Sequence, residues 1–333
     1  MKGASGRGPV GPANEWPQSA HVRKFIAKAA AAIWLCVLLE GETGTGKTYV
    51  ARAIHDRGPR VKGPFVGVNS ASLSETLLES ELFGHEKGAF TDAKNTHHGL
   101  IDHASGGTLL LDEIGEMSPG LQARLLTLLG DNRVYRRVGG VGDLRTDARF
   151  IFATNMNLLE LMARKLFRAD LYHRISPLRI TLPPLRQRLH DIPAMARILL
   201  ERHMVAAGAS GAAPILSPQA LDAFRAYPWP GNIRELANAL ASALLAADGA
   251  PVLQPDHLPS HILSGTPPAP DASPKPRRQR YVPPQDPAEE RRMIIEALRL
   301  TGWNRTKASA ALGMSRRTLW ERMRLYRIKE SDA

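Results

Sequence analysis

The segment GETGTGKT, residues 41 to 48, matches the phosphate-binding loop pattern G-x4-G-K-[ST]. An apolar run at 34–39 precedes it and a helical pattern, YVARAIH, follows it, which is the strand, loop and helix context that the pattern requires. Its glycines let backbone N–H groups turn inward around phosphate oxygens, and the amino end of the next helix adds partial positive charge. The alternative, a Gly/Thr-rich turn with a chance lysine, is disfavoured by these flanks.

This loop predicts a nucleotide site that also holds Mg²⁺. Lys47 carries a charge that can reach the β- and γ-phosphates, and Thr48 carries a hydroxyl suited to Mg²⁺. The nucleotide-binding residues predicted in this segment are Gly41, Glu42, Thr43, Gly44, Thr45, Gly46, Lys47 and Thr48.

Two carboxylates end a second apolar run, GGTLLLDE at 106–113. We expect them at the sheet edge that faces the phosphate loop, where Asp112 would hold Mg²⁺ through water and Glu113 would polarise the attacking water. An apolar strand that ends in Asp-Glu is commonplace alone, and it becomes specific when paired with the upstream loop. The next run, FIFATN, ends at Asn155, whose amide could touch the γ-phosphate or simply form a turn.

Apolar runs at 34–39, 65–68, 108–111 and 150–153 alternate with helical patterns. This alternation predicts an α/β fold, a parallel sheet covered by helices. After Pro183-Pro184 the strand signals stop, and the following segment to residue 247 predicts helices with a Pro-Trp-Pro-Gly break. We expect a disordered tail at 1–16, the α/β nucleotide-binding part at 17–183, an all-α lid at 184–262, a Pro-rich basic linker at 263–287 and a small all-α DNA-binding domain at 288–333.

The net charge of +12 over 333 residues is unevenly distributed. Residues 275–333 hold 15 Lys and Arg against 7 Asp and Glu, a net charge of +8, which favours a nucleic-acid module at this end. The single cysteine, Cys36, cannot form an internal disulfide, and the longest apolar run, at 29–39, is too short to span a bilayer. We therefore expect a cytoplasmic protein without membrane contact.

The C-terminal segment GWNRTKASAALGMSRRTLWERMRLYRI predicts a helix, a turn and a second helix. Asn304 would cap the first helix, Gly313 would end it, and Ser315 would cap the second. A solvated basic hairpin is the alternative to a DNA-binding motif. The predicted DNA contacts are Arg305, Lys307, Ser315, Arg316, Arg317, Thr318 and Arg322.

On the last of these helices, the spacing puts Leu319, Met323 and Tyr326 on one face, with Trp320 beside them. The arginines project elsewhere, where they could bond guanine edges or phosphates.

The segment ELFGHEKGAFTDA, residues 81–93, lies between the phosphate loop and the acidic strand end. It presents an aromatic residue, Phe90, among small residues, and it carries no hydrolytic chemistry of its own. We interpret it as a loop that the nucleotide cycle moves, with a hydrophobic plug between subunits as the alternative. Three nearby histidines, His97, His98 and His103, have no spacing that suits a zinc site.

From about residue 19 to 330 the chain resembles bacterial enhancer-binding proteins, the AAA+ activators of sigma-54 RNA polymerase. The motifs that carry the resemblance are GAFTDA, similar to the family's GAFTGA, together with DEIGEM, FRADLYHRI, LPPLRQRLHDI, YPWPGNIREL and a helix-turn-helix of the Fis type. Several long motifs in the right order are far more specific than any one of them.

The resemblance implies roles for four residues in ATP hydrolysis. Asn69 matches the position that holds Glu113 inactive until the γ-phosphate arrives. Arg168 and Arg174 match arginine fingers that reach a neighbouring subunit's site, which implies a hexameric ring. Arg234 matches the lid residue that senses the nucleotide.

The resemblance also implies partners. The loop residues expected to engage sigma-54 are Gly88, Ala89, Phe90, Thr91, Asp92 and Ala93. The C-terminal module would bind double-stranded enhancer DNA, and such modules dimerise through the preceding helix, here 288–300, on inverted half-sites.

Three departures from the family pattern matter. Asp92 replaces the family's second loop glycine, at a conformational cost of about 1 kcal/mol and with an added negative charge. A short tail precedes the ATPase core where many relatives carry a regulatory domain, so we expect control by expression level, a partner protein or a co-activator subunit in a mixed ring. Thr48 stands where many relatives have Glu, and it preserves the Mg²⁺ pattern.

Two rival functions stay open. The first is a DNA-binding AAA+ regulator that has the same fold, acts at ordinary promoters and does not remodel sigma-54 complexes. The altered loop residue Asp92 is the reason to retain this alternative. The other is a replication or chaperone-type ATPase, which the loop and the basic C-terminal module disfavour.

Overall fold

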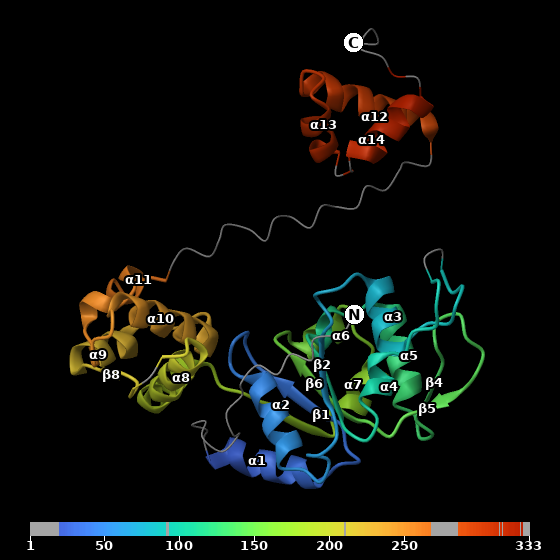
Figure 1. Cartoon of the computed structure of the whole chain (residues 1–333). Coiled ribbons are helices and arrows are strands. Elements are labelled where there is room, and N and C mark those ends of the chain that lie inside the picture. The colour runs from blue at the N-terminus through green and yellow to red at the C-terminus, as the bar shows by residue number, and fades with distance from the viewer. Residues whose placement is uncertain are drawn as a thin grey trace. The chain divides into compact units, whose positions relative to one another are not determined.

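A five-stranded parallel sheet lies at the centre of the α/β part of the chain (Figure 1). Its order is β2-β3-β6-β1-β7, and every pairing is parallel, as predicted. The strands are Phe65–Asn69 (β2), Thr108–Asp112 (β3), Arg149–Thr154 (β6), Val37–Glu40 (β1) and Leu178–Thr181 (β7). Because parallel strands end at the same edge, the segments that follow β1, β3 and β6 meet there.

The computed structural model describes residues 20–90, 93–209, 211–267, 286–312, 314, 316–326 and 328. It describes the backbone alone for six of them: Pro287, Lys307, Ala310, Ala311, Arg316 and Arg317. The expected tail at 1–16 and most of the expected linker at 263–287 lie outside these residues. The chain divides into two compact units, residues 1–267 and 268–333.

Alternate side chains of the strands supply the two cores of the α/β part. One face, with Val37 and Ile151, packs against α1 (Ala20–Ala31) and α2 (Lys47–Asp56). The other face, with Leu38, packs against α3 (Glu75–Phe83), α4 (Leu100–His103), α5 (Pro119–Leu128), α6 (Leu158–Ala163) and α7 (Ala169–Ile175). A strand buried on both faces is continuously apolar, which explains the run in β3.

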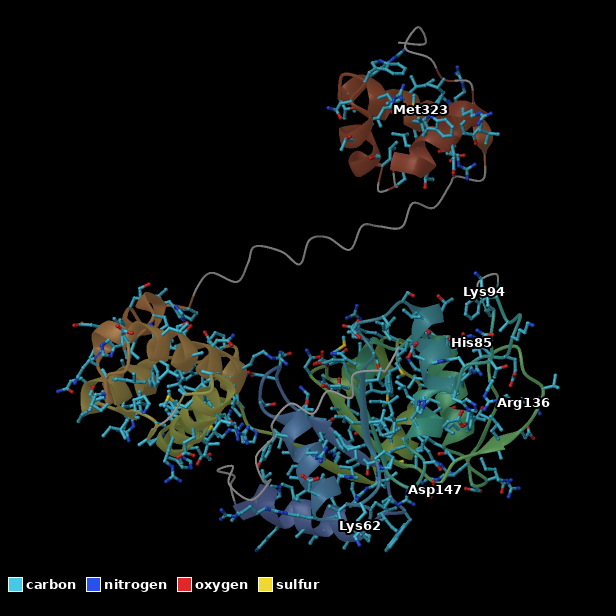
Figure 2. All side chains as sticks on the ribbon, in the orientation of Figure 1. Lys62, His85, Lys94, Arg136, Asp147 and Met323 are labelled. Carbon is cyan, nitrogen blue, oxygen red and sulfur yellow. The ribbon has the colours of Figure 1, made fainter. Side chains whose placement is uncertain are left out.

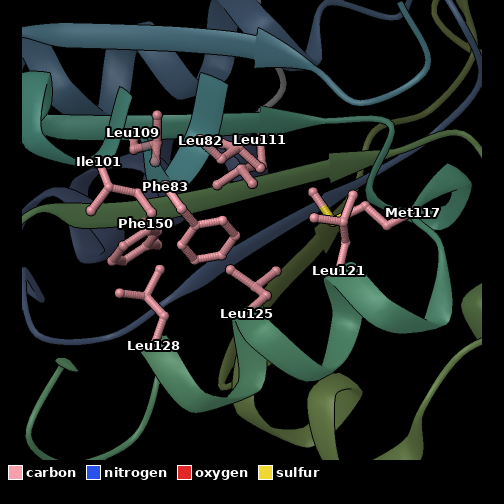
Figure 3. A pocket seen from close by; sticks show the side chains of 10 residues that line it. All are labelled: Leu82, Phe83, Ile101, Leu109, Leu111, Met117, Leu121, Leu125, Leu128 and Phe150. Atoms are coloured by element: carbon pink, nitrogen blue, oxygen red, sulfur yellow. The ribbon is translucent and has the colours of Figure 1, made fainter. Parts of the chain in front are cut away.

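The contact between α5 and the sheet is shown in Figure 3. Leu121, Leu125 and Leu128 recur at helical spacing and point toward Phe83 and Phe150. Ser118 caps the helix, with its side chain accepting a hydrogen bond from the Leu121 N–H, and Pro119 occupies the first turn.

Two insertions extend the α/β part between α3 and β6. The loop after α3 runs toward α4, and a short antiparallel pair, β4 (Val134–Tyr135) and β5 (Leu144–Arg145), follows α5. The chain at His85 bridges to both His97 and Val138, so the two insertions are joined at their bases.

The lid consists mainly of α8 (Ile192–Ala206), α9 (Pro218–Ala226), α10 (Asn232–Ala246) and α11 (Ser260–Leu263). The predicted Pro-Trp-Pro-Gly break separates α9 from α10, and its Trp229 is fully buried with a positive φ of 52°. Its indole N–H donates to the Phe224 carbonyl oxygen at 2.7 Å, which satisfies the buried donor.

The described residues of the second unit form three helices, α12 (Pro287–Leu300), α13 (Arg305–Ala311) and α14 (Arg316–Leu325). Their common core includes Ile294, Leu298, Ala308, Leu319 and Met323, the last labelled in Figure 2. The predicted α/β fold with a helical lid and a helix-turn-helix domain is confirmed.

Several local predictions were wrong. The first strand begins at Val37 and not at residue 34, because a turn follows α1 and leaves Trp34 69% exposed. Strand β7 was not predicted, because it is an edge strand with polar residues at 179 and 181. The lid is not strictly all-α, since β8 (Ile215–Leu216) pairs with β9 (Val252–Leu253). In the parts of the chain that are described, no helix is both long enough and apolar enough to cross a membrane.

Candidate functional site

The phosphate-loop segment leads from β1 into α2 and is closely packed. Gly44 has a φ of 83°, and a Cβ added there would lie 2.3 Å from the Gly231 carbonyl oxygen, so no larger residue fits. The Lys47 ammonium group donates to the carbonyl oxygens of Gly41 at 2.8 Å and Glu42 at 3.3 Å. The lysine therefore holds the loop in a closed turn.

Charge gathers around Lys47, which is 6% exposed. Burial lowers its pKa, while the carboxylates of Glu113 and Asp112 oppose that effect and Arg234 reinforces it. Arg234 lies beside the loop at Gly44, and Glu113, whose N–H donates to Asp112, is joined to Thr43 of the loop through Asn155. The structure thus brings the predicted acidic pair and the predicted lid arginine to the phosphate loop.

Glu113 has a backbone conformation that is unusual for its type. Its φ of 56° is in the left-handed region, which costs a non-glycine residue roughly 1–3 kcal/mol and is often found at functional sites. Its N–H donates to Asp112 Oδ1 at 3.0 Å, and its Oε2 accepts from the Asn155 N–H at 3.1 Å. The carboxylate is therefore held toward the end of β6.

Asn155 links that strand end to the phosphate loop, because its Nδ2 donates to Thr43 Oγ1 at 3.0 Å. Asn69 ends β2 beside Asp112, and its Oδ1 accepts from the Ala71 N–H at 2.8 Å. Among the described residues no hydrogen bond joins Asn69 to Glu113. Restraint of Glu113 by Asn69 stays a prediction.

The lid meets the phosphate loop through the start of α10. The Ile233 N–H donates to the Gly44 carbonyl oxygen at 3.0 Å. A Cβ added at Gly44 would lie 3.2 Å from the Cβ of Arg234, so the predicted sensor stands directly beside the loop.

The two predicted arginine fingers lie at the surface at the start and end of α7. Arg168 donates to both carboxylate oxygens of Asp170, at 3.0 and 2.7 Å. Arg174 donates to Asp131 Oδ1 and to the Leu129 carbonyl oxygen, each at 2.6 Å. Within the described residues neither arginine bonds the phosphate loop of its own chain.

The loop that carries GAFTDA is fixed at its root and exposed toward its tip. The Ala93 N–H donates to the Phe90 carbonyl oxygen at 2.9 Å, and the Gly88 N–H donates to the Ala93 carbonyl oxygen at 2.8 Å. Phe90 is 45% exposed, with its ring edge-on to His85 at a centroid distance of 4.9 Å. Thr91 and Asp92 lie outside the described residues. Figure 2 labels His85 beside α3 and Lys94 farther out along the loop.

Arg137, from the chain after β4, holds the root of this loop. It donates to Glu86 Oε1 at 2.9 Å and lies 3.4 Å from Asp102 Oδ2. The hydrogen bond from Arg137 lowers the pKa of Glu86. Gly139 approaches the loop closely, since a Cβ there would lie 2.8 Å from the Cβ of Ala89.

In the second unit, Asn304 caps α13 as predicted, with Oδ1 accepting from the Thr306 N–H at 3.1 Å. Arg305 is exposed and Thr318 is half-buried. Gly313 and Ser315, and the side chains of Lys307, Arg316 and Arg317, lie outside what is described.

Two expectations for α14 need correction. Arg322 is turned toward the core, where its Nε lies 3.2 Å from Oε1 of Glu290, a carboxylate that is 2% exposed. Trp320 is not on the core face but is 51% exposed, with the Arg324 guanidinium 5.7 Å from its ring centre. The outward face of α14 therefore carries Trp320 and Arg324, and Arg322 has a structural partner.

Three family models match consecutive parts of the chain: the sigma-54 interaction domain over 14–181, the AAA+ ATPase lid domain over 186–275 and the bacterial regulatory protein domain of the Fis family over 287–326. The first alone covers half of the chain. The chain belongs to the sigma-54 interaction family of AAA+ ATPases.

Its similarity to regulatory proteins extends over most of its length. It is 42% identical to the regulatory protein AtoC of Escherichia coli over 95% of this chain and 68% of AtoC, and 40% identical to the DNA-binding transcriptional regulator NtrC of Salmonella typhimurium over 93% and 69%. It is 52% identical to the Nif-specific regulatory protein of Azospirillum brasilense over 62% of this chain and 32% of that protein. The chain thus corresponds to a part of each relative.

Solved structures of one protein share the fold. NtrX from Brucella abortus, in complex with ADP, has a TM-score of 0.68 at 29% identity, covering 95% of this chain and 70% of NtrX. The complex of NtrX with ATP gives a TM-score of 0.67 at 30% identity. The resemblance predicted from the motifs is confirmed, and the α/β part with its lid is an AAA+ ATPase.

Functional candidates of two kinds were not predicted from the sequence. Asn232 and Arg186 contact the phosphate loop from the lid side, and no local pattern connects them to it. Leu319 and Met323 mark the buried face of α14, and Trp320 and Arg324 lie off that face. This helical spacing was present in the sequence and could have identified them.

Proposed function

We propose that this chain is an ATP-driven activator that binds enhancer DNA and remodels the closed complex of sigma-54 RNA polymerase. One observation carries the proposal: a single α/β domain combines a hydrolytic arrangement at the end of β3 with an exposed aromatic residue, Phe90, on an inserted loop. A nucleotide site that only stores ATP has no use for such a loop.

The residues of the phosphate loop suit a nucleotide with Mg²⁺. Lys47 would exchange its carbonyl partners for phosphate oxygens, and Thr48 and Asp112 carry the oxygen ligands that Mg²⁺ prefers. When bound, Mg²⁺ neutralises charge that develops on the phosphates. The similarity to NtrX, solved with ADP and with ATP, supports nucleotide binding.

Hydrolysis would use groups that are already oriented. Glu113 would accept a proton from the attacking water, with its carboxylate steered by the Asn155 backbone. The Asn155 amide, which bonds Thr43 in this structure, would contact the γ-phosphate. Asn69 would restrain Glu113, and Arg234 would couple the bound nucleotide to the position of the lid.

Arg168 and Arg174 would act on the site of a neighbouring subunit in a hexameric ring, formed by this chain or with a related co-activator subunit. Their surface ion pairs with acidic residues could be exchanged for phosphate contacts, and arginine fingers contribute about 10³–10⁵ in rate. Mixing inactive Lys47→Ala with inactive Arg174→Ala subunits tests this, because action between subunits restores part of the ATPase rate. No recovery at any mixing ratio contradicts it.

The second unit would bind double-stranded DNA with α14, and α12 would form the dimer contact. Support comes from the match to the Fis family over 287–326 and from the exposed Trp320 and Arg324. A guanidinium stacked on an indole is preorganised for a phosphate or a base edge.

A second function has one residue in its favour. Asp92 puts a negative charge at a position where the family has glycine, which would suit a DNA-binding AAA+ regulator that does not remodel sigma-54. The two functions share every nucleotide and DNA contact, so binding assays do not separate them.

In vitro transcription with sigma-54 holoenzyme, a linear enhancer template and ATP separates them. Open complexes that resist heparin support remodelling, with Lys47→Ala as the matched inactive control. Enhancer binding and ATP hydrolysis without open complexes support the second function. Absence of ATP hydrolysis with the cognate duplex present contradicts both.

A further inference from the structure

Asn232 stands at the junction of the lid with the phosphate loop. It is the first residue of α10, it is fully buried, and its φ of 52° lies in the left-handed region. Asparagine is one of the few non-glycine residues that tolerate this conformation. The turn that it makes directs α10 so that Arg234, two residues later, stands beside Gly44.

The Asn232 carboxamide joins three segments of the chain. Its Oδ1 accepts from the Leu185 N–H at 2.7 Å, in the segment that enters the lid. Its Nδ2 donates to the Thr43 carbonyl oxygen and to Glu42 Oε2, each at 3.1 Å. Two of these three bonds end on the phosphate loop, 189 and 190 residues away in sequence.

Glu42 is held from the same side by Arg186. The guanidinium donates to both carboxylate oxygens, at 2.8 and 2.6 Å, in a bidentate pair. These bonds from Arg186, and next the bond from Asn232, lower the pKa of Glu42 to about 2. The carboxylate is therefore ionised at neutral pH.

A second contact from the segment that holds Arg186 reaches the loop. Arg188, which is buried, donates to the Thr45 carbonyl oxygen at 2.8 Å. Thr43 in turn accepts from Asn155, which holds Glu113. Hydrogen bonds that share the residues Thr43 and Asn155 thus connect Asn232 of the lid, through the loop, to the Glu113 carboxylate.

We propose that Glu42, Arg186 and Asn232 form an interlock through which a displacement of the phosphate loop by nucleotide turns the lid and Arg234. Asn232 is a positioning residue in this interlock, since it touches the loop and not the reacting atoms. The inference rests on the proposed ATPase function. It adds the mechanical connection by which the loop and the lid respond together.

Two substitutions distinguish the effect of the Asn232 side-chain hydrogen bonds from the effect of its backbone conformation. Asn232→Gly keeps the positive φ and removes every hydrogen bond that the side chain makes. Asn232→Asp keeps the acceptor for Leu185 but puts a second carboxylate at about the distance of the present bond to Glu42. Gln219→Glu, on the exposed surface of α9, adds the same charge to the lid away from the junction and is the matched control.

The first measurement is nucleotide affinity, with fluorescent ADP and ATP analogues. We expect Asn232→Asp to raise the Kd by about 10- to 100-fold and Asn232→Gly by several-fold, because a charge-assisted network is lost. Gln219→Glu should stay within about 2-fold of the wild type. In the double variant Glu42→Gln, Asn232→Asp, the amide is at position 42 and the carboxylate at position 232, so the two side chains can again form an amide–carboxylate hydrogen bond. This double variant should recover most of the nucleotide affinity.

The second measurement does not depend on turnover. In the wild type, ADP should slow hydrogen exchange in both 41–48 and 229–240. In Asn232→Gly, ADP should still protect the first segment and should no longer protect the second.

The outcomes are distinct. Failure of the wild type to bind nucleotide overturns the proposed function itself. Wild-type affinity in Asn232→Asp, or undiminished protection of 229–240 in Asn232→Gly, overturns the interlock and leaves the function standing. If Asn232→Asp loses its thermal unfolding transition, the exchange result for Asn232→Gly decides.

Discussion

The nucleotide site and the GAFTDA loop belong to the same domain but are built on opposite principles. At the nucleotide site, Asn155 and Asn232 each bond a group in another segment. Lys47 bonds carbonyl oxygens of its own loop, and Lys47 and Asn232 are buried. The loop is tied down at its root by Arg137 and His85, while Phe90 remains 45% exposed.

The difference reflects what each region must do. Charge stabilisation in a transition state depends on dipoles that are oriented before the reaction, and such orientation needs a packed surrounding. Partner recognition by an aromatic side chain gains its free energy when exposed surface becomes buried, so the ring has to be available beforehand. Changes at Glu113, Phe90 and Asp92 test whether the two regions are separable in this way.

The largest expected effect is that of Glu113→Gln. The amide cannot accept a proton, so the ATPase kcat should fall by about 10²–10⁴, while the Kd for ATP changes little. Steady-state phosphate release and analogue binding measure the two quantities. Glu201→Gln, on the lid surface, is the control. A Glu113→Gln variant with more than a tenth of the wild-type rate would contradict the assignment of the base.

The next effect is that of Phe90→Ala on the other region. Loss of a ring that becomes buried should weaken sigma-54 binding by about 10- to 100-fold, and ATPase activity should stay within about 2-fold. Binding to sigma-54 in the presence of an ATP transition-state analogue measures the first quantity. A parallel loss of hydrolysis would mean that the two regions are not separable.

The same contrast between fixed and exposed groups recurs within α14. Arg324→Ala should weaken enhancer DNA binding by about 5- to 30-fold and reduce its salt dependence, with the thermal stability of the second unit unchanged. Arg322→Ala should lower that stability, because it leaves the Glu290 carboxylate buried without its guanidinium partner. Fluorescence anisotropy at two salt concentrations and thermal unfolding distinguish the variants. If Arg322→Ala keeps its stability and loses DNA, the orientation of α14 toward DNA is the reverse of the one proposed.

The smallest expected effect is that of Asp92→Gly. Glycine removes a conformational cost of about 1 kcal/mol and one negative charge. The affinity for sigma-54 should therefore rise by roughly 2- to 5-fold, and the ATPase activity should stay intact. Open-complex yield at limiting protein measures it, with Asp143→Gly in the neighbouring insertion as the control for a charge change. No change in yield would remove the reason to single out this residue.

Much of the hydrolytic site could be predicted because its chemistry is local in sequence. The phosphate loop is one contiguous segment, and Asp112, Glu113 and Asn155 follow directly from buried strands whose parallel order brings their ends together. The helices of the lid and of the second unit could be predicted because their apolar residues recur at helical spacing, which marks the buried face of each helix.

Prediction failed where a residue's environment depended on distant segments. Trp34 lies in an apolar run that predicts a strand, but a turn leaves its side chain exposed. Arg322 belongs to a basic run, yet a buried carboxylate 32 positions earlier in the chain draws it toward the core.

The sequence by itself determined the AAA+ ATPase class of this protein, the chemical groups that would hydrolyse ATP and the presence of a basic helical module, because motif spacing and apolar periodicity are properties of neighbouring residues. The tertiary structure alone decided that Asn232 and Arg186 close on Glu42, that Glu113 is steered by a backbone N–H, and that Arg324 faces outward where Arg322 does not. Such contacts arise when packing brings together groups far apart along the chain, and no local pattern records them.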